Sequence, residues 1–433
     1  MSTLQDLNQV LSRKQDILEN AAGVEKIKKS GKLTARERVD LLLDDGSFME
    51  QAMLLSDAGV VTGSGTVEGR PVYVVAQDFA VMDGAVGSKQ AKKVVKVLEL
   101  ARKTGTPVVL MCDSNGARVG EGAAALEAYA DIFAHMARLS GVVPMIAMVL
   151  GPCVGAAAMM AELADLTIVA GNGALLEAGP TVISATMGKD VMKATELGGA
   201  KIAVENGAAH FACEAEEEAF ATAKKLLGML PANNLEDAPF SMEEDMNRQL
   251  TGLSAGADGK AVIEAMADAG SVLEVGAGYT GAVTAFAKMA GRTVAFAYTG
   301  KGDTCDKRME KIARFVRFAD CYNIPVVSLV DSVAVVDHQH AAEICSGFDQ
   351  SRLYRVAESV LCGLVDYVEG FKRRHVRQCF SCCACGGQLH GKVCFAFAGI
   401  ALQNGQLAEG NVGIPQPTYF GLLYVLHADH GNG

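Results

Sequence analysis

Short apolar runs and amphipathic segments alternate along most of the chain. Strand-like runs and segments with apolar residues at helical spacing follow one another at 61–69, 71–79, 88–105, 106–114 and 121–141. Ahead of them, residues 1–45 predict two helices, the second within 32–44 with Thr34 as its N-terminal cap. Strands that alternate with helices predict a layered α/β fold.

The stretch Val142–Glu162 has the form of a buried strand, a turn and a helix. Its apolar run Met145–Leu150 is short enough for a strand, and Gly151-Pro152 should stop that strand. The small residues Gly155–Ala158 leave the backbone N–H groups at the helix start uncovered. Such groups favour an anion and can stabilise a developing enolate. The alternative is that these small residues only permit tight packing of strand and helix.

A membrane-spanning helix is a further interpretation of this stretch, because no charged residue lies between Arg138 and Glu162. Pro144 and Gly151-Pro152 would break such a helix, and no flanking residues anchor it. We therefore reject this interpretation.

The pattern of strand, helix and strand recurs about 220 residues later. Gly69-Arg70-Pro71-Val72 is echoed by Gly291-Arg292-Thr293-Val294, an offset of 291 − 69 = 222. The strand that ends at Asp113 is echoed by one that ends at Asp331, an offset of 331 − 113 = 218. Two such copies predict two similar domains in tandem, and one copy has lost four residues. The polar stretch 231–245 is the expected linker.

Composition restricts the class of protein. The chain has 433 residues, of which 50% are hydrophobic and 21% charged, enough for two or three globular domains. The net charge of −11 argues against nucleic acid as a partner, so phosphate groups of a ligand need local Lys, Arg or backbone N–H groups. The polar N-terminus has no apolar signal core, which predicts a cytoplasmic protein whose twelve Cys are thiols.

Several motifs in a fixed order carry a resemblance to a known family. They lie between about Gly31 and Val336 and read KLTARERVDLLLD, GVVTGSGTVEGRPVYVVAQDFAVMDGAVGSKQAKK, SNGARVGEG, GPCVGAAAMMAELAD, ELGGA, GAAHF and KIARFVRFADCYNIPVVSLVD. In this order the chain resembles the carboxyltransferase subunits of biotin-dependent acyl-CoA carboxylases and decarboxylases, of the propionyl-CoA carboxylase beta and methylmalonyl-CoA decarboxylase alpha type.

The resemblance implies tandem crotonase-like (ClpP/crotonase) α/β domains, with the C-terminal one incomplete. We expect an N-terminal carboxyltransferase domain in 1–235, the start of a second in 246–336 and an atypical tail in 337–433. The implied activity is carboxyl transfer between biotin on a separate carrier protein and a short-chain acyl-CoA, through an enolate held by backbone oxyanion holes. The implied partners are a biotin carboxyl carrier protein, a biotin carboxylase or decarboxylase membrane subunit, and further copies of the chain in a homo-oligomer.

The same resemblance assigns site residues. Gly155 and Ala156 match the Gly-Gly pair of the oxyanion hole, with Ala in place of the second Gly. The segment Ser114–Arg118, which includes Gly116 and Ala117, matches a Ser-Gly-Gly-Ala-Arg turn, with Asn115 in place of the first Gly. Ala156 is tolerated in place of the second Gly if its φ is negative. Asn115 suits the turn because Asn accepts left-handed dihedrals better than most residues.

Charged residues near these motifs are candidate substrate contacts. Arg118 either acts near the site or forms an ion pair with Asp113 or Glu121. Lys89, Lys92 and Lys93, together with Lys96, are candidates for the phosphates of CoA, although lysines at this spacing also suit a solvated helix face. His210 lies in the motif GAAHF, where a structural role is the alternative.

The resemblance ends after Val336, where the family's second oxyanion turn is missing. The last 97 residues hold seven of the twelve Cys and six of the eight His, among them Cys379, Cys382, Cys383, Cys385, His390 and Cys394. One explanation is a metal site built on the C-x₂-C pair Cys382 and Cys385. The other, which we favour, is a change of reading frame near Asp337, so we assign no metal ligands.

Two other functions are compatible with the same motifs. A crotonase-like hydratase or isomerase would need a carboxylate over the substrate α-carbon, and Glu121 and Glu177 are the candidates. A divergent or damaged subunit without turnover would keep the fold and CoA binding but lack the second oxyanion hole.

Overall fold

The computed structural model describes residues 3–18, 21–55, 59–188, 190, 192–241, 257–301, 306–330, 392–397 and 422–429. It divides into two compact units, Met1–Asp237 and Ala238–Gly433. The candidate metal ligands Cys379, Cys382, Cys383, Cys385 and His390, and the start of the proposed frameshift at Asp337, lie outside the described residues.

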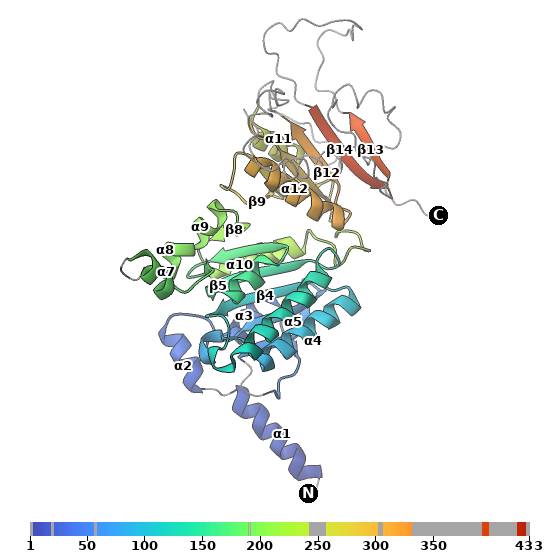
Figure 1. Ribbon diagram of the computed structural model, residues 1–433. Helices are drawn as coiled ribbons and strands as arrows, with labels where there is room; N and C mark the ends of the chain where they lie inside the picture. Colours follow the sequence, from blue (N-terminus) through green and yellow to red (C-terminus); the bar gives the residue numbers. More distant parts are fainter. Residues whose placement is uncertain are drawn as a thin grey trace, which may run out of the picture. The chain divides into compact units, whose positions relative to one another are not determined.

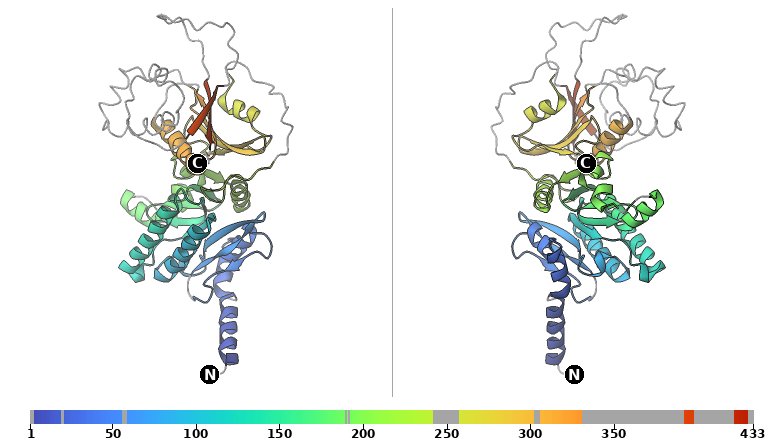
Figure 2. Two further views of the ribbon diagram at one scale, coloured as in Figure 1. Left: turned by 90° about the vertical axis from the view of Figure 1, so that its right-hand side faces the viewer. Right: turned by 90° about the vertical axis from the view of Figure 1, so that its left-hand side faces the viewer.

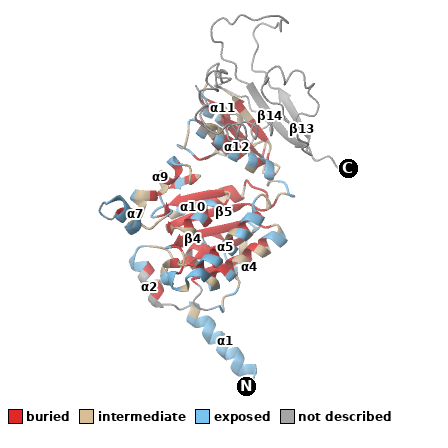
Figure 3. Ribbon diagram, in the orientation of Figure 1, coloured by how far each residue is buried: buried red, intermediate tan, exposed pale blue. Residues whose placement is uncertain are grey.

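The N-terminal segment forms three helices where the sequence predicted two. They are α1 (Thr3–Leu18), α2 (Ala21–Lys29) and α3 (Ala35–Leu42). The predicted cap of α3 is confirmed, because the Thr34 hydroxyl accepts the Glu37 N–H at 3.2 Å and the Glu37 carboxylate accepts the Thr34 N–H at 2.9 Å. None of the residues of α1 is buried, and it is coloured as exposed in Figure 3.

The first unit is built on one mixed sheet with the order β1-β2-β3-β4-β5-β6-β8, in which β7 also pairs with β5. The strands are β1 (Met49–Glu50), β2 (Val60–Val67), β3 (Arg70–Gln77), β4 (Val108–Ser114), β5 (Met145–Val154), β6 (Leu166–Ala170), β7 (Ala174–Leu176) and β8 (Phe211–Cys213). A two-residue turn with positive φ at Glu68 and Gly69 joins β2 to β3, and β3 to β6 then run parallel.

Helices cover both faces of this sheet (Figure 1). The remaining helices of the unit are α4 (Ser88–Thr104), α5 (Ala123–Leu139), α6 (Ala156–Glu162), α7 (Pro180–Met187), α8 (Ala194–Gly198), α9 (Ala200–Glu205) and α10 (Glu216–Leu227), with one-turn 3₁₀ helices η1 (Met82–Gly84) and η2 (Val119–Glu121). The helices α4 and α5 lie side by side in Figures 1 and 2 and enclose the main core with β3, β4 and β5. In β3, β4 and β5 the residues on the opposite face of the sheet are buried too. The helices α3 and α10 also contact the sheet.

The second unit repeats the order of the first as far as β12, which then pairs with β14 in the antiparallel direction. It contains α11 (Gly259–Met266), β9 (Leu273–Val275), β10 (Val283–Met289), β11 (Arg292–Tyr298), α12 (Asp306–Cys321), β12 (Val326–Val330), β13 (Lys392–Phe397) and β14 (Leu422–Asp429). As in the first unit, an antiparallel pair with a positive-φ turn, here Ala290-Gly291, precedes a helix and a parallel strand. The sheet order is β13-β14-β12-β11-β10-β9.

The predicted buried strand at Met145–Leu150 is confirmed, but it does not stop at Gly151-Pro152. β5 continues to Val154 because Pro152, Cys153 and Val154 pair with β7. A glycine and a proline are tolerated here because they lie where the pairing with β4 is irregular.

Candidate functional site

The junction of β5 and α6 is the first half of the candidate site. Gly155 precedes α6 with φ of 60° and ψ of −124°, a conformation that favours glycine. The Gly155 N–H donates to the Leu176 carbonyl at 2.8 Å, so this amide is already engaged by β7. Ala156 begins the helix with a negative φ, which removes the objection to Ala at this position. Its N–H has no hydrogen-bond acceptor within the part of the chain that the structure describes.

The turn after β4 is the second half. Gly116 has φ of 98°, its N–H donates to the Ser114 hydroxyl at 3.0 Å, and its carbonyl accepts the Val86 N–H at 2.9 Å. The Arg118 N–H in turn donates to the Val86 carbonyl at 2.9 Å. The N–H of Ala117, which lies between them, therefore faces away from Val86, and among the described residues no acceptor contacts it.

The replacement of a family glycine by Asn115 is accommodated without strain. Asn115 has a negative φ, and the left-handed conformation falls on Gly116 instead. The Asn115 N–H donates to the Asp83 carbonyl at 3.1 Å. This contact ties the turn to η1, where Met82 and Asp83 both have positive φ although neither is glycine.

The two halves lie against each other. Ser114 pairs with Cys153 in the parallel register of β4 and β5. A Cβ placed on Gly116 would lie only 2.8 Å from the Val154 carbonyl, so the turn touches the strand end that leads into Gly155. Ala117 and Ala156 are both half-buried and hence within reach of solvent. The structure thus brings together two strand ends, each followed by a backbone N–H for which the described part of the chain provides no acceptor.

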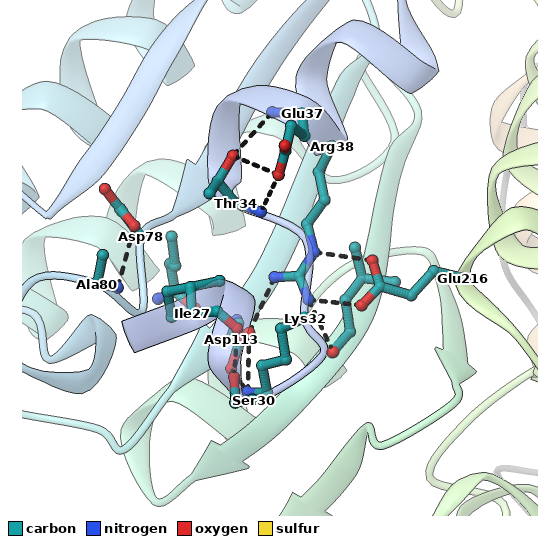
Figure 4. A network of polar contacts seen from close by, with 12 residues as sticks. Ile27, Ser30, Lys32, Thr34, Glu37, Arg38, Asp78, Ala80, Asp113 and Glu216 are labelled. Carbon is teal, nitrogen blue, oxygen red and sulfur yellow. Dashed lines mark hydrogen bonds and ion pairs between the residues drawn. The ribbon is translucent and has the colours of Figure 1, made fainter. Parts of the chain in front are cut away.

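A buried ionic cluster surrounds Asp113, the last residue but one of β4 (Figure 4). The Asp113 carboxylate accepts hydrogen bonds from the Lys32 ammonium at 3.0 and 3.2 Å and from Arg38 Nη1 at 2.9 Å. Arg38 also donates to the Glu216 carboxylate, from Nε at 2.9 Å and from Nη2 at 2.6 Å. Asp113 is therefore paired with Lys32 and Arg38 and does not form the ion pair with Arg118 that the sequence allowed.

Arg118 and Glu121 support the turn from its other side. The Arg118 Nε donates to the Ala85 carbonyl at 3.0 Å, and its Nη1 lies 3.9 Å from the Glu121 carboxylate. Glu121 accepts the N–H of Ser88 at 2.8 Å and the hydroxyl of the same residue at 3.0 Å, which caps the start of α4. These hydrogen bonds hold the pKa of the Glu121 carboxyl below its usual value. A low pKa suits a helix cap and does not suit a general acid at neutral pH.

The candidate phosphate contacts separate into two groups. Lys89, Lys92 and Lys96 are exposed on α4. Lys93 is 4% exposed, and its ammonium group donates to the Val60 carbonyl at 2.5 Å. Burial lowers the pKa of Lys93. We therefore remove Lys93 from the candidate contacts, because its ammonium group faces the sheet and not the solvent.

The other sequence candidates have structural surroundings. His210 Nδ1 accepts the Thr167 N–H at 3.0 Å, and the His210 N–H donates to the Thr167 carbonyl at 2.9 Å, which favours the structural alternative. Glu177 is exposed at the end of β7. Within the described ranges no group of His, Cys, Asp and Glu has the arrangement of a metal site, and no helix is both long and apolar enough to span a bilayer.

These features define an α/β protein with a candidate site of main-chain N–H groups at adjacent strand ends. A family model described as "Carboxyl transferase domain" matches residues 26–334. The methylmalonyl-CoA carboxyltransferase 12S subunit of Propionibacterium freudenreichii subsp. shermanii is 40% identical over 362 residues, covering 76% of this chain and 69% of the relative. The methylmalonyl-CoA decarboxylase subunit alpha of Veillonella parvula is 37% identical over 364 residues, covering 76% and 71%.

A solved structure agrees with these relatives. The crystal structure of a transcarboxylase 12S, described as a hexamer assembly with methylmalonyl-coenzyme A bound, matches with a TM-score of 0.69 and 36% identity and covers 79% of this chain and 74% of its own. The chain therefore belongs to the carboxyl transferase domain family, a family of transferase enzymes, and has the crotonase-like α/β fold. The resemblance seen in the sequence is confirmed.

Proposed function

We propose that the chain transfers a carboxyl group between biotin on a separate carrier protein and a short-chain acyl-CoA of the methylmalonyl or propionyl type. The observation that carries the proposal is the pair of strand ends at Gly116 and Gly155, each followed by an N–H group that has no acceptor among the described residues. The names of the relatives favour methylmalonyl-CoA and propionyl-CoA as substrates.

The backbone geometry supports a role for each of the predicted main-chain site residues. The Ala117 and Ala156 N–H groups donate to the thioester oxygen of the acyl-CoA, which gains negative charge when the α-carbon loses its carboxyl group or its proton. Gly116 and Gly155 do not donate themselves, because their N–H groups bind Ser114 and Leu176. They provide the positive-φ turns that direct the next amide outward.

Neutral backbone donors fit a thioester oxygen well. They stabilise an oxyanion without giving up a proton, so the enolate is held and not quenched. Biotin, when bound, would carry the carboxyl group on its ureido nitrogen. The family's second oxyanion turn is missing from the sequence after Val336, so no residue of this chain is assigned to biotin.

The charged residues contribute to binding and to the shape of the turn. Lys89 and Lys92, which are exposed, attract the phosphates of CoA. Arg118 orients the turn through Ala85 and Glu121. The domains are 1–235, 246–336 and the tail 337–433, and the chain works as a homo-oligomer with a biotin carboxyl carrier protein and a biotin carboxylase or a decarboxylase membrane subunit.

The test is decarboxylation of methylmalonyl-CoA and malonyl-CoA by the purified full chain, with and without free biotin. We expect CO₂ release that depends on biotin. Biotin-independent hydration or isomerisation of an unsaturated acyl-CoA would instead support the hydratase or isomerase alternative. Binding of CoA without any turnover would refute the proposed activity and support a subunit that keeps the fold only.

A further inference from the structure

The pairing of β4 with β5 is interrupted next to the candidate site. Cys112 pairs with Val149, and the next pair is Ser114 with Cys153. Two steps along β4 (114 − 112) therefore correspond to four steps along β5 (153 − 149), so β5 carries two extra residues. This β-bulge faces Asp113. Bulges redirect a strand, and this one lies immediately before the segment that ends at Ala156.

The Asp113 side chain fills the space that the bulge opens. Its carboxylate is 1% exposed and lies so close to Gly151 that a Cβ on Gly151 would collide with it. Because Asp113 belongs to β4 and Gly151 to β5, the carboxylate lies between the two strand ends. Its charge is compensated by Lys32 and Arg38.

Arg38 links the same two strands from outside the sheet. Its Nη1 donates to Asp113 on β4 at 2.9 Å, and its Nη2 donates to the Leu150 carbonyl in the bulge of β5 at 3.1 Å. Glu216, the first residue of α10, holds the guanidinium through two further hydrogen bonds. Burial opposes the charge of Arg38, but Glu216 and Asp113 outweigh it and raise the pKa of the guanidinium, so Arg38 stays charged.

The cluster is better suited to fixing geometry than to adding stability. Removing two cations and two carboxylates from water is costly, and a buried ionic cluster is often no more stable than an apolar replacement. Bidentate arginine bonds have a strict geometry, however. The Ala117 amide lies four residues after Asp113 (117 − 113), and the Ala156 amide lies six residues after Leu150 (156 − 150). A clamp at Asp113 and Leu150 therefore sets the spacing of both donors.

We infer that Arg38 and Asp113, held by Lys32 and Glu216, are positioning residues that fix the separation of the two oxyanion-hole strand ends by bridging the β5 bulge. This inference rests on the proposed function, because it concerns the donors Ala117 and Ala156. It explains why a lysine and an arginine in the N-terminal motif KLTARERVDLLLD lie beside a site formed by residues more than 70 positions away.

The experiment compares R38M, R38K and E216Q with a matched control, R36M. Arg36 lies on the same helix and forms its own ion pair with Glu50 at 2.6 Å, but none of its hydrogen bonds reaches β4 or β5. For R38M we expect kcat to fall about 100-fold with KM changed by less than about threefold, since a misplacement of about 1 Å at the reacting centre has that effect. R38K should lose less, and R36M should keep the wild-type kcat.

A spectroscopic measurement separates positioning from stability. The infrared band of a ¹³C-labelled propionyl-CoA carbonyl should shift to lower frequency when bound to the wild type, because two N–H groups donate to it. In R38M the shift should be reduced at a temperature where the variant is fully folded, and in R36M it should be unchanged. If R38M does not fold, E216Q decides, with an expected kcat loss of about tenfold and a partial loss of the shift.

The outcomes are distinct. A folded R38M or E216Q with wild-type kcat and a wild-type carbonyl shift would overturn the positioning role. A wild-type protein that neither turns over acyl-CoA nor shifts the carbonyl band would refute the proposed function itself. Equal losses in R36M and R38M would show that loss of any ion-paired arginine on α3 has this effect, and would also overturn the inference.

Discussion

The replacement of Ala156 by proline removes one proposed oxyanion donor with little other change. Ala156 is the first residue of α6, and proline is favoured at this position because the N–H there has no partner within the helix. The preceding Gly155 has an extended ψ of −124°, so it avoids the helical conformation that a following proline disfavours. The fold should therefore tolerate A156P.

The catalytic effect should be large. Removal of one oxyanion-hole donor typically lowers kcat by about 10²–10³, which corresponds to about 2.7–4 kcal/mol of transition-state stabilisation. We expect A156P to lose that much in biotin-dependent decarboxylation of methylmalonyl-CoA. Its thermal unfolding midpoint should stay within a few degrees of the wild type, because the Ala156 N–H makes no hydrogen bond with any described residue.

The chain offers a closely matched control at the start of α5. Gly122 precedes Ala123 with φ of 54° and ψ of −129°, nearly the dihedrals of Gly155, and Ala123 is the exposed first residue of its helix. A123P thus introduces the same residue in the same backbone setting away from the proposed donors. It should keep activity within about threefold of the wild type. Equal activity of A156P and A123P would refute the assignment of the Ala156 N–H.

Three further results are expected. G116A should lower kcat by about 10- to 100-fold, because Gly116 has φ of 98° and a Cβ there would lie 2.8 Å from the Val154 carbonyl, whereas G120A, with no atom within 4 Å of the added Cβ, should have wild-type kinetics. Burial lowers the pKa of Lys311 from its ordinary value of 10.5 to about 8. Between pH 8 and pH 10.5 this lysine is therefore protonated in the unfolded chain but largely neutral in the folded protein. Urea unfolding should therefore show stability rising by about 3 kcal/mol over this pH range, and K311M should abolish that rise. E121Q should weaken the cap of α4 and lower the thermal midpoint slightly while carboxyl transfer continues, and a loss of all activity would return Glu121 to the role of a catalytic acid or base.

Local sequence signals predicted the parts of the fold that local chemistry determines. The N-terminal cap at Thr34, the strand of β4 and the helix that follows Gly155 all depend on neighbouring residues, and the structure confirms them. The engagement of the Gly155 N–H by Leu176 was not predictable in this way. It depends on β7, a strand of three residues with no pattern of its own, which pairs with β5 from more than 20 positions away.

The ionic cluster was missed for a related reason. Asp113 lies within a fully buried strand, so its burial was foreseeable, but Arg118, five residues further along the chain, looked like the natural partner. The real partners come from residues 32 and 38, and nothing in the spacing of charges along the chain brings them to this place. The only sequence signal for the cluster was the presence of Lys32 and Arg38 in the N-terminal motif. The register of β4 and β5 was needed to show that these two residues reach Asp113.

A comparison of the two copies of the repeat distinguishes residues of the shared scaffold from residues of the candidate site. The Lys93 ammonium group donates to the Val60 carbonyl, and the Lys311 ammonium group donates to the Ala282 carbonyl. The two lysines are 311 − 93 = 218 residues apart and the two carbonyls 282 − 60 = 222, which are the offsets found at the two ends of the sequence repeat. The lysine that resembled a phosphate ligand is thus part of the shared scaffold, in which a helix is tied to the start of an antiparallel pair. The four residues by which the copies differ fall between the second strand and the helix. In the first unit that segment contains Asp83, whose carbonyl accepts the Asn115 N–H beside the proposed donors. The difference in length between the copies therefore falls in the segment that contacts the turn of the proposed donors, and not in the helix or the strands of the shared scaffold.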